Sequence, residues 1–257
     1  MTAMHASLPM YDRVETRGQT DRFWALIRDA LRDRGIAAPD ALTRDFASPW
    51  DLWQSPDLLL SQTCGLPLRA KLQDRVRLVC TPDFALPGCP PGYYTSVLIT
   101  RADHATTPMQ TLLRGRIAIN EGLSQSGWGA LCSYAADLGL TPAKPSLTGG
   151  HALSACAVLD GHADLAAIDA QTWRLLCRYE PDLSDLIERD RTRPTPGLPL
   201  ITAQGRNPAP LIAALHDALA ALSPIDRETL GLAGFARIPL ADYKALPLPP
   251  NPDDLLQ

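Results

Sequence analysis

Short apolar runs alternate with helix-like segments along most of this chain, and this alternation restricts its fold more than any other feature of the sequence. The apolar runs 116–120 and 163–168 are followed by the segments 126–138 and 169–179, in which apolar side chains recur at helical spacing. Strands followed by helices, repeated along a chain, are typical of α/β proteins with mostly parallel sheets. We therefore expect mostly parallel sheets flanked by helices.

The same patterns predict the other elements. An early helix with the apolar positions Phe23, Ile27 and Leu31 is expected to stop at Gly35, because glycine commonly ends helices. Further helices are expected at 151–159 and 209–222, and further strands at 5–9, 58–60, 76–80, 96–100, 146–148 and 200–203.

The length of the chain indicates two lobes, because 257 residues exceed what one compact core usually holds. A passage rich in proline and glycine, 194–199, interrupts the alternation. We infer a discontinuous first lobe, residues 1–96 and 198–245, and a second lobe, residues 97–197. The chain would then cross between the lobes near residues 97 and 197, and two such crossings form a hinge. The proline-rich tail, 246–257, is expected to be extended or disordered.

Charge and composition exclude several kinds of partner. The net charge is −4 and no basic run occurs, so the chain lacks the basic surface that binds nucleic acid or an anionic membrane. No apolar stretch approaches the ~20 residues that span a bilayer.

The six cysteines lack metal-binding or redox spacing, so we expect no metal and no cofactor. The N-terminus lacks the regions of an export signal, so the chain as written is expected in the cytoplasm.

Two segments place glycines and serines between a strand and a helix. The first, 117–128, has Ser124 and Ser126 where a helix begins, and the second, 146–154, has His151 directly after two glycines. The first N–H groups of a helix lack an intrahelical partner, and the helix dipole adds about half a positive charge there, so an oxyanion can bind without lysine or arginine. In a parallel sheet such loops gather at the carboxyl ends of the strands, where Asp169 would join them.

Each of these residues also has a purely structural interpretation. Ser124 and Asp169 could cap their own helices, and His151 could be a buried structural histidine. Trp128 and Trp173, which lie near helix starts, fit a core or lid better than a stacking surface for a ligand. The motifs alone leave both interpretations open.

The ordered set of motifs resembles a known family, the phosphate- and phosphonate-type substrate-binding proteins of ABC transporters, which have the type 2 periplasmic binding protein fold. Residues 124–127 read Ser-Gln-Ser-Gly, where that family usually has Ser-Thr-Ser-Gly. Residues 149–151 read Gly-Gly-His, and residues 161–169 read Gly-x-Ala-Asp-x-Ala-Ala-x-Asp. The resemblance covers most of residues 5–205. It implies two lobes that close on a ligand like a Venus flytrap.

The resemblance further implies solute binding without catalysis. The solute would be a small oxyanion of the phosphate, phosphonate or phosphite type, bound by a monomer that meets an ABC transporter permease in the periplasm. Asp169 would accept a hydrogen bond from a protonated ligand oxygen or an amino group. Four residues of the second lobe would hold the oxyanion: Ser124, Gln125, Ser126 and His151. Three residues of the first lobe would join them: Tyr11, Gln62 and Thr63.

Two other classes of function stay open at this point. Residues 122–126 read Gly-Leu-Ser-Gln-Ser and nearly match the Gly-x-Ser-x-Gly elbow of hydrolases, but serine replaces the last glycine. Biosynthetic enzymes also occur on this two-lobed fold. The second class is a ligand sensor. A transcription regulator would need a helix-turn-helix segment, which the pattern does not show, whereas a free-standing cytoplasmic sensor would not.

Overall fold

The chain builds two units of structure from interleaved segments. The computed structural model describes residues 4–255. Unit 1 comprises the chain up to Tyr93 and the segment Pro196–Lys244, and unit 2 comprises Tyr94–Thr195 and the chain from Ala245 onward. The chain therefore passes between the units after residues 93, 195 and 244. The third passage lies directly before the proline-rich tail.

Unit 1 is built on a four-stranded sheet in the order β1-β2-β12-β3. Strands β1 and β2 run parallel, whereas β12 is antiparallel to both of its neighbours. A separate pair of strands, β4 and β13, is antiparallel. The bounds of these strands are β1 (His5–Ser7), β2 (Leu58–Gln62), β3 (Val76–Leu78), β4 (Thr81–Asp83), β12 (Leu200–Ala203) and β13 (Gly234–Ala236).

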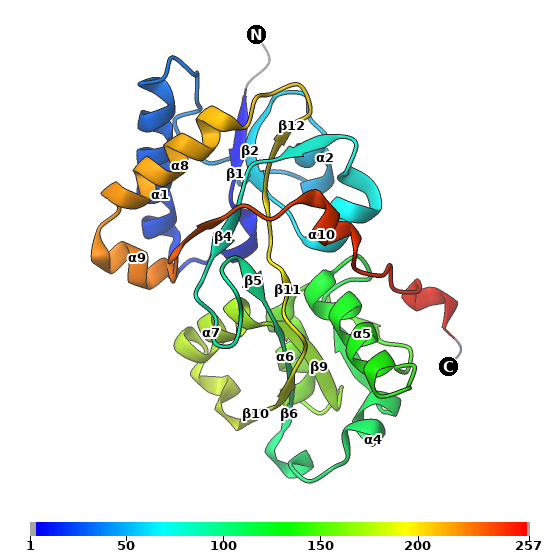
Figure 1. Cartoon of the computed structure of the whole chain (residues 1–257). Coiled ribbons are helices and arrows are strands. Elements are labelled where there is room, and N and C mark those ends of the chain that lie inside the picture. Colours follow the sequence, from blue (N-terminus) through cyan, green and yellow to red (C-terminus); the bar gives the residue numbers. More distant parts are fainter. Residues whose placement is uncertain (1–3, 256–257) are drawn as a thin grey trace. The chain divides into compact units, whose positions relative to one another are not determined.

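Helices lie on both faces of this sheet (Figure 1). Neighbouring strand residues point to opposite faces, and accordingly Leu58 and Leu59 belong to different cores. The Leu59 core lies under α1 (Arg17–Arg32) and α8 (Ala209–Ala221), which pack against each other. The Leu58 core lies under α2 (Pro49–Trp53), the π-helix η2 (Leu68–Leu72) and α10 (Leu240–Lys244). The remaining helices are η1 (Pro9–Tyr11), α3 (Gly65–Pro67) and α9 (Pro224–Leu230).

Unit 2 is built on a five-stranded sheet in the order β10-β6-β9-β7-β8. Strand β7 is parallel to β8 and β9, whereas β6 is antiparallel to β9 and β10. The strands are β6 (Ser96–Arg101), β7 (Ile117–Ile119), β8 (Ser146–Leu147), β9 (Leu165–Asp169) and β10 (Leu186–Arg191). The main helices are α4 (Met109–Arg114), the π-helix η4 (Gln125–Gly129) that continues into α5 (Ala130–Asp137), α6 (His151–Leu159) and α7 (Ala170–Tyr179). Short helices are η3 (Ala102–His104), η5 (Pro181–Asp185) and η6 (Pro252–Asp254), and β5 (Tyr93–Tyr94) pairs with β11 (Thr195–Pro196).

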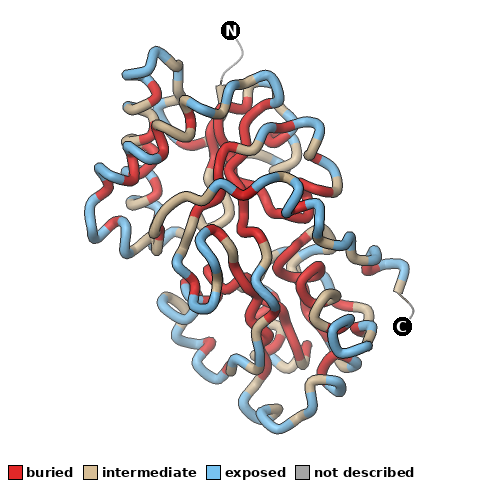
Figure 2. The backbone as a smooth tube through the Cα atoms, viewed as in Figure 1, coloured by how far each residue is buried: buried red, intermediate tan, exposed pale blue. Residues whose placement is uncertain are grey.

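The central strands of each sheet are buried along their length (Figure 2). In unit 2 the core contains Leu98, Ile117, Leu131 and Leu165, and Leu255 of the proline-rich tail packs against it. Composition predicted a tail that is extended or disordered, yet Pro252 is buried and the Trp128 indole donates a hydrogen bond of 2.6 Å to the Pro250 carbonyl. Residues 250–255 therefore contact unit 2, whereas most side chains of residues 245–251 are exposed.

The predicted α/β class is confirmed, but the sheets are mixed rather than mostly parallel. Strands β6 and β12 run against their neighbours, and an apolar run carries no information on the direction in which a strand is traversed. The helix expected at 126–138 begins instead with the π-turn η4. Cys64 and Cys80 are buried, whereas Cys156 and Cys177 are exposed.

The described part of the chain contains neither a membrane-spanning helix nor a metal cluster. Within residues 4–255 no helix is both long enough and apolar enough to cross a membrane. The same residues contain no group of three or more His, Cys, Asp and Glu side chains that could hold a metal ion.

Candidate functional site

Three loops leave the sheet of unit 2 at the same edge. Strands β7, β8 and β9 are parallel, and each is followed by a helix: η4 and α5, α6, and α7. Two backbone hydrogen bonds join the first two loops, from Thr148 N–H to Ile119 O at 2.9 Å and from Gly149 N–H to Asn120 O at 2.9 Å. Because main-chain bonds hold them together, the side chains on these loops have fixed relative positions.

Ser124, Ser126 and His151 form a hydrogen-bonded cluster at this edge, called the serine–histidine cluster below. The Ser124 hydroxyl accepts a hydrogen bond of 3.0 Å from Gly127 N–H and so caps the helix that follows. Its Oγ lies 3.4 Å from Ser126 Oγ, and Ser126 Oγ lies 2.8 Å from His151 Nε2. The structure therefore brings together the starts of two helices that are 25 residues apart in the chain.

Gly127 is needed at its position because the Asn120 side chain lies against it. A Cβ atom at Gly127 would lie 2.1 Å from Asn120 Oδ1 and 3.2 Å from Ser124 Oγ. Asn120 Oδ1 is buried and has no hydrogen-bond partner among the residues that the structure describes. Gln125 is buried as well, and its side-chain oxygen lies against Gly129, so its amide group runs along its own helix.

The electrostatics of the serine–histidine cluster depend on His151. Desolvation lowers the pKa of His151 to about 4, and the nearby backbone of Ala167 opposes this shift only in part. That backbone contact is weak, because His151 Nδ1 makes no hydrogen bond of ordinary geometry within residues 4–255. A neutral imidazole has one donor and one acceptor nitrogen, so Nε2 either accepts from or donates to the Ser126 hydroxyl. Near neutral pH the three side chains of the cluster carry no formal charge.

Asp169 ends β9 at the same edge of the sheet. Its Oδ1 accepts a hydrogen bond of 2.8 Å from Thr172 N–H, so it caps α7, and its side chain is buried. Trp128 and Trp173 are both buried, and the Trp173 indole donates a hydrogen bond of 2.8 Å to Glu188. The structural interpretation is therefore correct for both tryptophans, and capping is one role of Ser124 and of Asp169.

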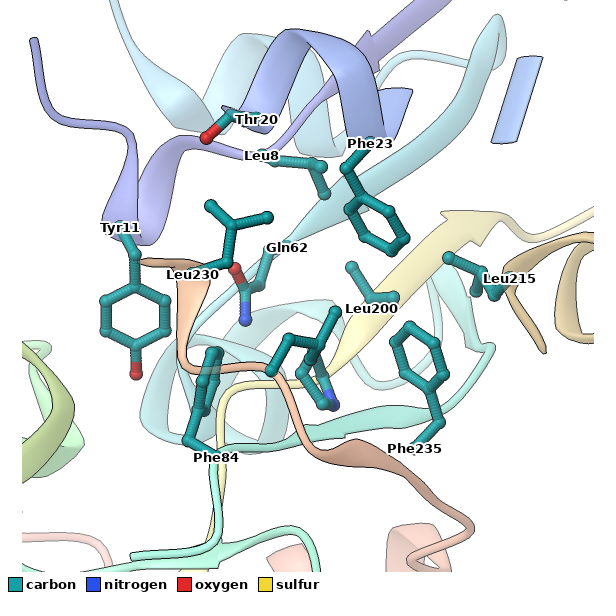
Figure 3. Close-up of a pocket in the computed structure, with 12 residues that line it drawn as sticks. Leu8, Tyr11, Thr20, Phe23, Gln62, Phe84, Leu200, Leu215, Leu230 and Phe235 are labelled. Carbon is teal, nitrogen blue, oxygen red and sulfur yellow. The ribbon is translucent and has the colours of Figure 1, made fainter. Parts of the chain in front are cut away.

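The residues predicted for the first lobe lie in unit 1, near the carboxyl ends of β1 and β2. The Tyr11 ring packs edge-on against Phe84, with 4.9 Å between the ring centroids. Gln62 Nε2 donates a hydrogen bond of 3.1 Å to the Leu198 carbonyl. Tyr11 and Gln62 line one pocket of unit 1, shown in Figure 3. Thr63 follows Gln62, is fully buried, and donates its N–H to the Pro199 carbonyl at 3.0 Å.

Sequence reasoning missed several residues that shape these two places. The sequence analysis assigns no role to Asn120, which ends the expected strand 116–120. An asparagine between a buried strand and a serine-rich loop could have indicated a residue that shapes the loop. Thr148 Oγ lies 2.7 Å from Ser154 Oγ and ties the second loop to the first turn of α6. Phe84 reaches the Tyr11 pocket from a distant segment, and no local pattern marks it.

Comparison with known proteins assigns the fold. No curated protein matches the chain. PhnD1 from Prochlorococcus marinus, solved in complex with methylphosphonate, is 15% identical with a TM-score of 0.68, over 94% of each chain. XAC2383 from Xanthomonas citri, solved with ATP, is 16% identical with a TM-score of 0.67, over 95% of this chain and 96% of that one. A binding protein component of an ABC phosphonate transporter from Pseudomonas aeruginosa is 15% identical with a TM-score of 0.65, over 91% and 80%.

These likenesses show the periplasmic binding protein fold. The comparison with protein families also assigns a family. The family model described as "ABC transporter, phosphonate, periplasmic substrate-binding protein" matches residues 69–246. That match covers more than half of the 257 residues. The chain therefore belongs to the family of periplasmic substrate-binding proteins of phosphonate ABC transporters.

Proposed function

We propose that this protein binds a small oxyanion of the phosphonate, phosphate or phosphite type at the serine–histidine cluster of unit 2 and presents it to an ABC transporter permease. One observation carries the proposal: the 2.8 Å contact between Ser126 and His151 joins the starts of two helices at one edge of the sheet. Helix starts supply N–H groups and a partial positive charge, which together favour an anion.

The charge of the site supports a partly protonated ligand. The serine–histidine cluster has no formal charge, so hydrogen bonds rather than ion pairs would hold the oxyanion. Asp169, at the same edge, is a carboxylate that would accept a hydrogen bond from a protonated ligand oxygen and repel a fully ionised one. Sulfate carries no proton near neutral pH, so we expect the site to discriminate against it.

We also propose that Tyr11, Gln62 and Thr63 of unit 1 contact the ligand, that the protein acts as a monomer, and that it leaves the ligand chemically unchanged. The Ser126–His151 pair resembles a nucleophile with its general base. In a catalytic triad, however, a carboxylate orients the histidine through its other nitrogen. His151 Nδ1 has no such hydrogen bond within residues 4–255, which favours binding over hydrolysis.

The proposal is tested by thermal unfolding of the purified protein with methylphosphonate, phosphate, phosphite and sulfate. A ligand of the folded state at about 100 times its Kd adds about 2.7 kcal/mol of stability, so the Tm should rise with ligand concentration. Ser126→Ala should weaken binding about ten- to 150-fold, because a hydrogen bond to a charged group is worth about 1.5–3 kcal/mol. Ser133→Ala, which changes a serine of α5 outside the cluster, is the matched control and should bind as the wild type does.

Two results would contradict the proposal. If Ser126→Ala and His151→Ala keep the full anion-induced rise in Tm, the ligand does not bind at the serine–histidine cluster. If phosphorus NMR of methylphosphonate or of a phosphate ester incubated with the protein shows a new product that Ser126→Ala does not form, the protein is a hydrolase.

A further inference from the structure

A second pocket of unit 1 takes no part in the proposed function. It lies beside β3, which is the edge strand of the sheet, and the segment directly after β13 forms another part of its wall. We call it the β3 pocket. All of its lining residues belong to unit 1, so the β3 pocket is a feature of that unit alone. No further strand pairs with the outer side of β3 within residues 4–255, which leaves this side of the sheet open.

The β3 pocket is apolar inside and basic at its mouth. The buried side chains of Val76, Val79 and Ile238 line it, and the exposed side chains of Arg77 and Arg237 line it as well. No Asp or Glu side chain is part of the lining in the described chain. Although the whole chain has a net charge of −4, the two guanidinium groups give this pocket a local positive charge.

The two arginines differ from many others in the chain, because no carboxylate pairs with them. Arg22, for example, forms an ion pair with Asp226. Arg77 Nε instead donates a hydrogen bond of 2.8 Å to the Gln204 carbonyl, which fixes the side chain and leaves its terminal nitrogens without a partner among the described residues. Arg237 has no hydrogen bond or ion pair within residues 4–255. A guanidinium group with N–H groups to spare can bind a carboxylate through two parallel hydrogen bonds.

The size of the β3 pocket restricts what could occupy it. Its volume is about 530 Å³. Sites for small organic molecules measure about 300–1,000 Å³, and a cavity of about 150 Å³ already holds benzene. An inorganic anion would fill a small part of the pocket and leave its apolar wall in contact with water. An anion that carries an apolar body larger than a single methyl group matches the volume, the wall and the charge together.

We propose that the β3 pocket is a second binding site, for a small organic carboxylate with an apolar body. The carboxylate binds the guanidinium groups at the mouth, and the apolar body displaces water from the buried side chains of the wall. The inference goes beyond the proposed function and does not depend on it, because the β3 pocket and the serine–histidine cluster belong to different units.

The test is calorimetric titration of the full chain with 4-phenylbutyrate and 1-naphthylacetate, two carboxylates with different apolar bodies. At least one of them should bind. Its neutral amide keeps the apolar body but lacks the charge, and it should bind about fivefold more weakly, which is the upper end for an exposed ion pair. Acetate has the charge without the apolar body and should give no measurable binding.

Substitutions at the mouth locate the site. The double variant Arg77→Gln/Arg237→Gln should bind the acid and its amide equally, with the amide affinity unchanged, whereas Arg114→Gln, on an exposed arginine of α4, should keep the preference for the acid. Gln204→Trp adds volume at an exposed lining residue and should weaken both probes. Gln110→Trp makes the same change on the exposed surface of α4 and should weaken neither.

Three results would overturn the inference. The first is that neither carboxylate binds, and the second is that the double arginine variant keeps the preference for the acid. The third is that Ser126→Ala abolishes binding of the carboxylate, which would place it at the serine–histidine cluster. The methylphosphonate titration tests the proposed function separately, so either proposal can fail while the other stands.

Discussion

His151 links the serine–histidine cluster to the pH dependence of stability. The pKa of His151 is lowered from its ordinary value of 6.5 to about 4 by desolvation. Between these two values the unfolded chain binds a proton that the folded chain does not, so the unfolded state gains as the pH falls. The contribution of His151 to stability is therefore complete above pH 6.5 and is lost as the pH falls towards 4.

We predict that the Tm of the wild type falls more steeply than that of His151→Gln between pH 6.5 and pH 4. Glutamine keeps a polar side chain at the start of α6 but has no proton to take up, so its curve should be flatter. Circular dichroism melts at several pH values measure the difference. His162→Gln changes an exposed histidine and should leave the wild-type slope unchanged. Parallel curves for the wild type and His151→Gln would show that His151 stays hydrated in the folded state.

Residues that a local sequence pattern marks could be predicted, whereas residues that folding brings together from distant segments could not. Ser124, Ser126 and His151 lie at helix starts that a local pattern of strand, glycine and helix reveals, and the structure brings them together. Their function as ligands stays a prediction. The lining of the Tyr11 pocket could not be predicted, because Phe23, Phe84 and Phe235 come from segments far apart, and only the folded chain makes them neighbours.

The proline-rich tail contacts the helix and the loop that carry Ser124 and Ser126. Trp128 lies in η4, two residues after Ser126, and its indole N–H donates to the Pro250 carbonyl at 2.6 Å. Pro252 lies against Gly122 in the loop before the helix, since a Cβ atom on that glycine would be 3.1 Å from the proline ring. The tail thus contacts the helix and the loop that position Ser124 and Ser126.

We predict that Trp128→Phe loosens the tail and weakens oxyanion binding severalfold. Phenylalanine keeps an aromatic side chain in the core but cannot donate to Pro250, and a net hydrogen bond is worth about 1 kcal/mol, or roughly fivefold in an equilibrium constant. Hydrogen exchange of residues 250–255 and titration with methylphosphonate measure the two effects. Trp173→Phe removes the corresponding indole bond to Glu188 and should leave both unchanged. Equal exchange of the tail in wild type and Trp128→Phe would show that this bond does not hold it.

Element types were easier to predict than element directions. Helix α6 begins and ends at the residues that the pattern gives, because two glycines precede it and Asp160 and Gly161 follow it. The antiparallel course of β6 and β12 could not be predicted, since a buried strand has the same composition in either direction. The π-turn η4 was also missed, because glycines at 127 and 129 indicate a loop or a helix start without fixing the hydrogen-bond spacing.

At the scale of the whole molecule, the chain divides its apolar residues between separate cores. Unit 1 has cores on the two faces of its sheet, and unit 2 has its own core around Leu98 and Leu131. The chain passes between the units three times, so neither unit is one continuous segment. The length of the chain predicted two lobes, but the sequence could not assign the tail to one of them. That assignment depends on the contacts that Trp128, Pro252 and Leu255 make in the folded chain.

We predict that a cavity in a core of one unit destabilises that unit first. Leu131 of α5 and Leu215 of α8 are both fully buried, so Leu131→Ala and Leu215→Ala form a matched pair, each expected to cost about 2–5 kcal/mol. In native-state hydrogen exchange, Leu131→Ala should reduce protection in β7 and β9 while β2 and β12 stay protected, and Leu215→Ala should do the reverse. A methylphosphonate-induced rise in protection should be lost at lower temperature in Leu131→Ala than in Leu215→Ala, because the serine–histidine cluster belongs to unit 2. If both variants lower protection uniformly from β1 to β12, the separate cores unfold as one cooperative structure.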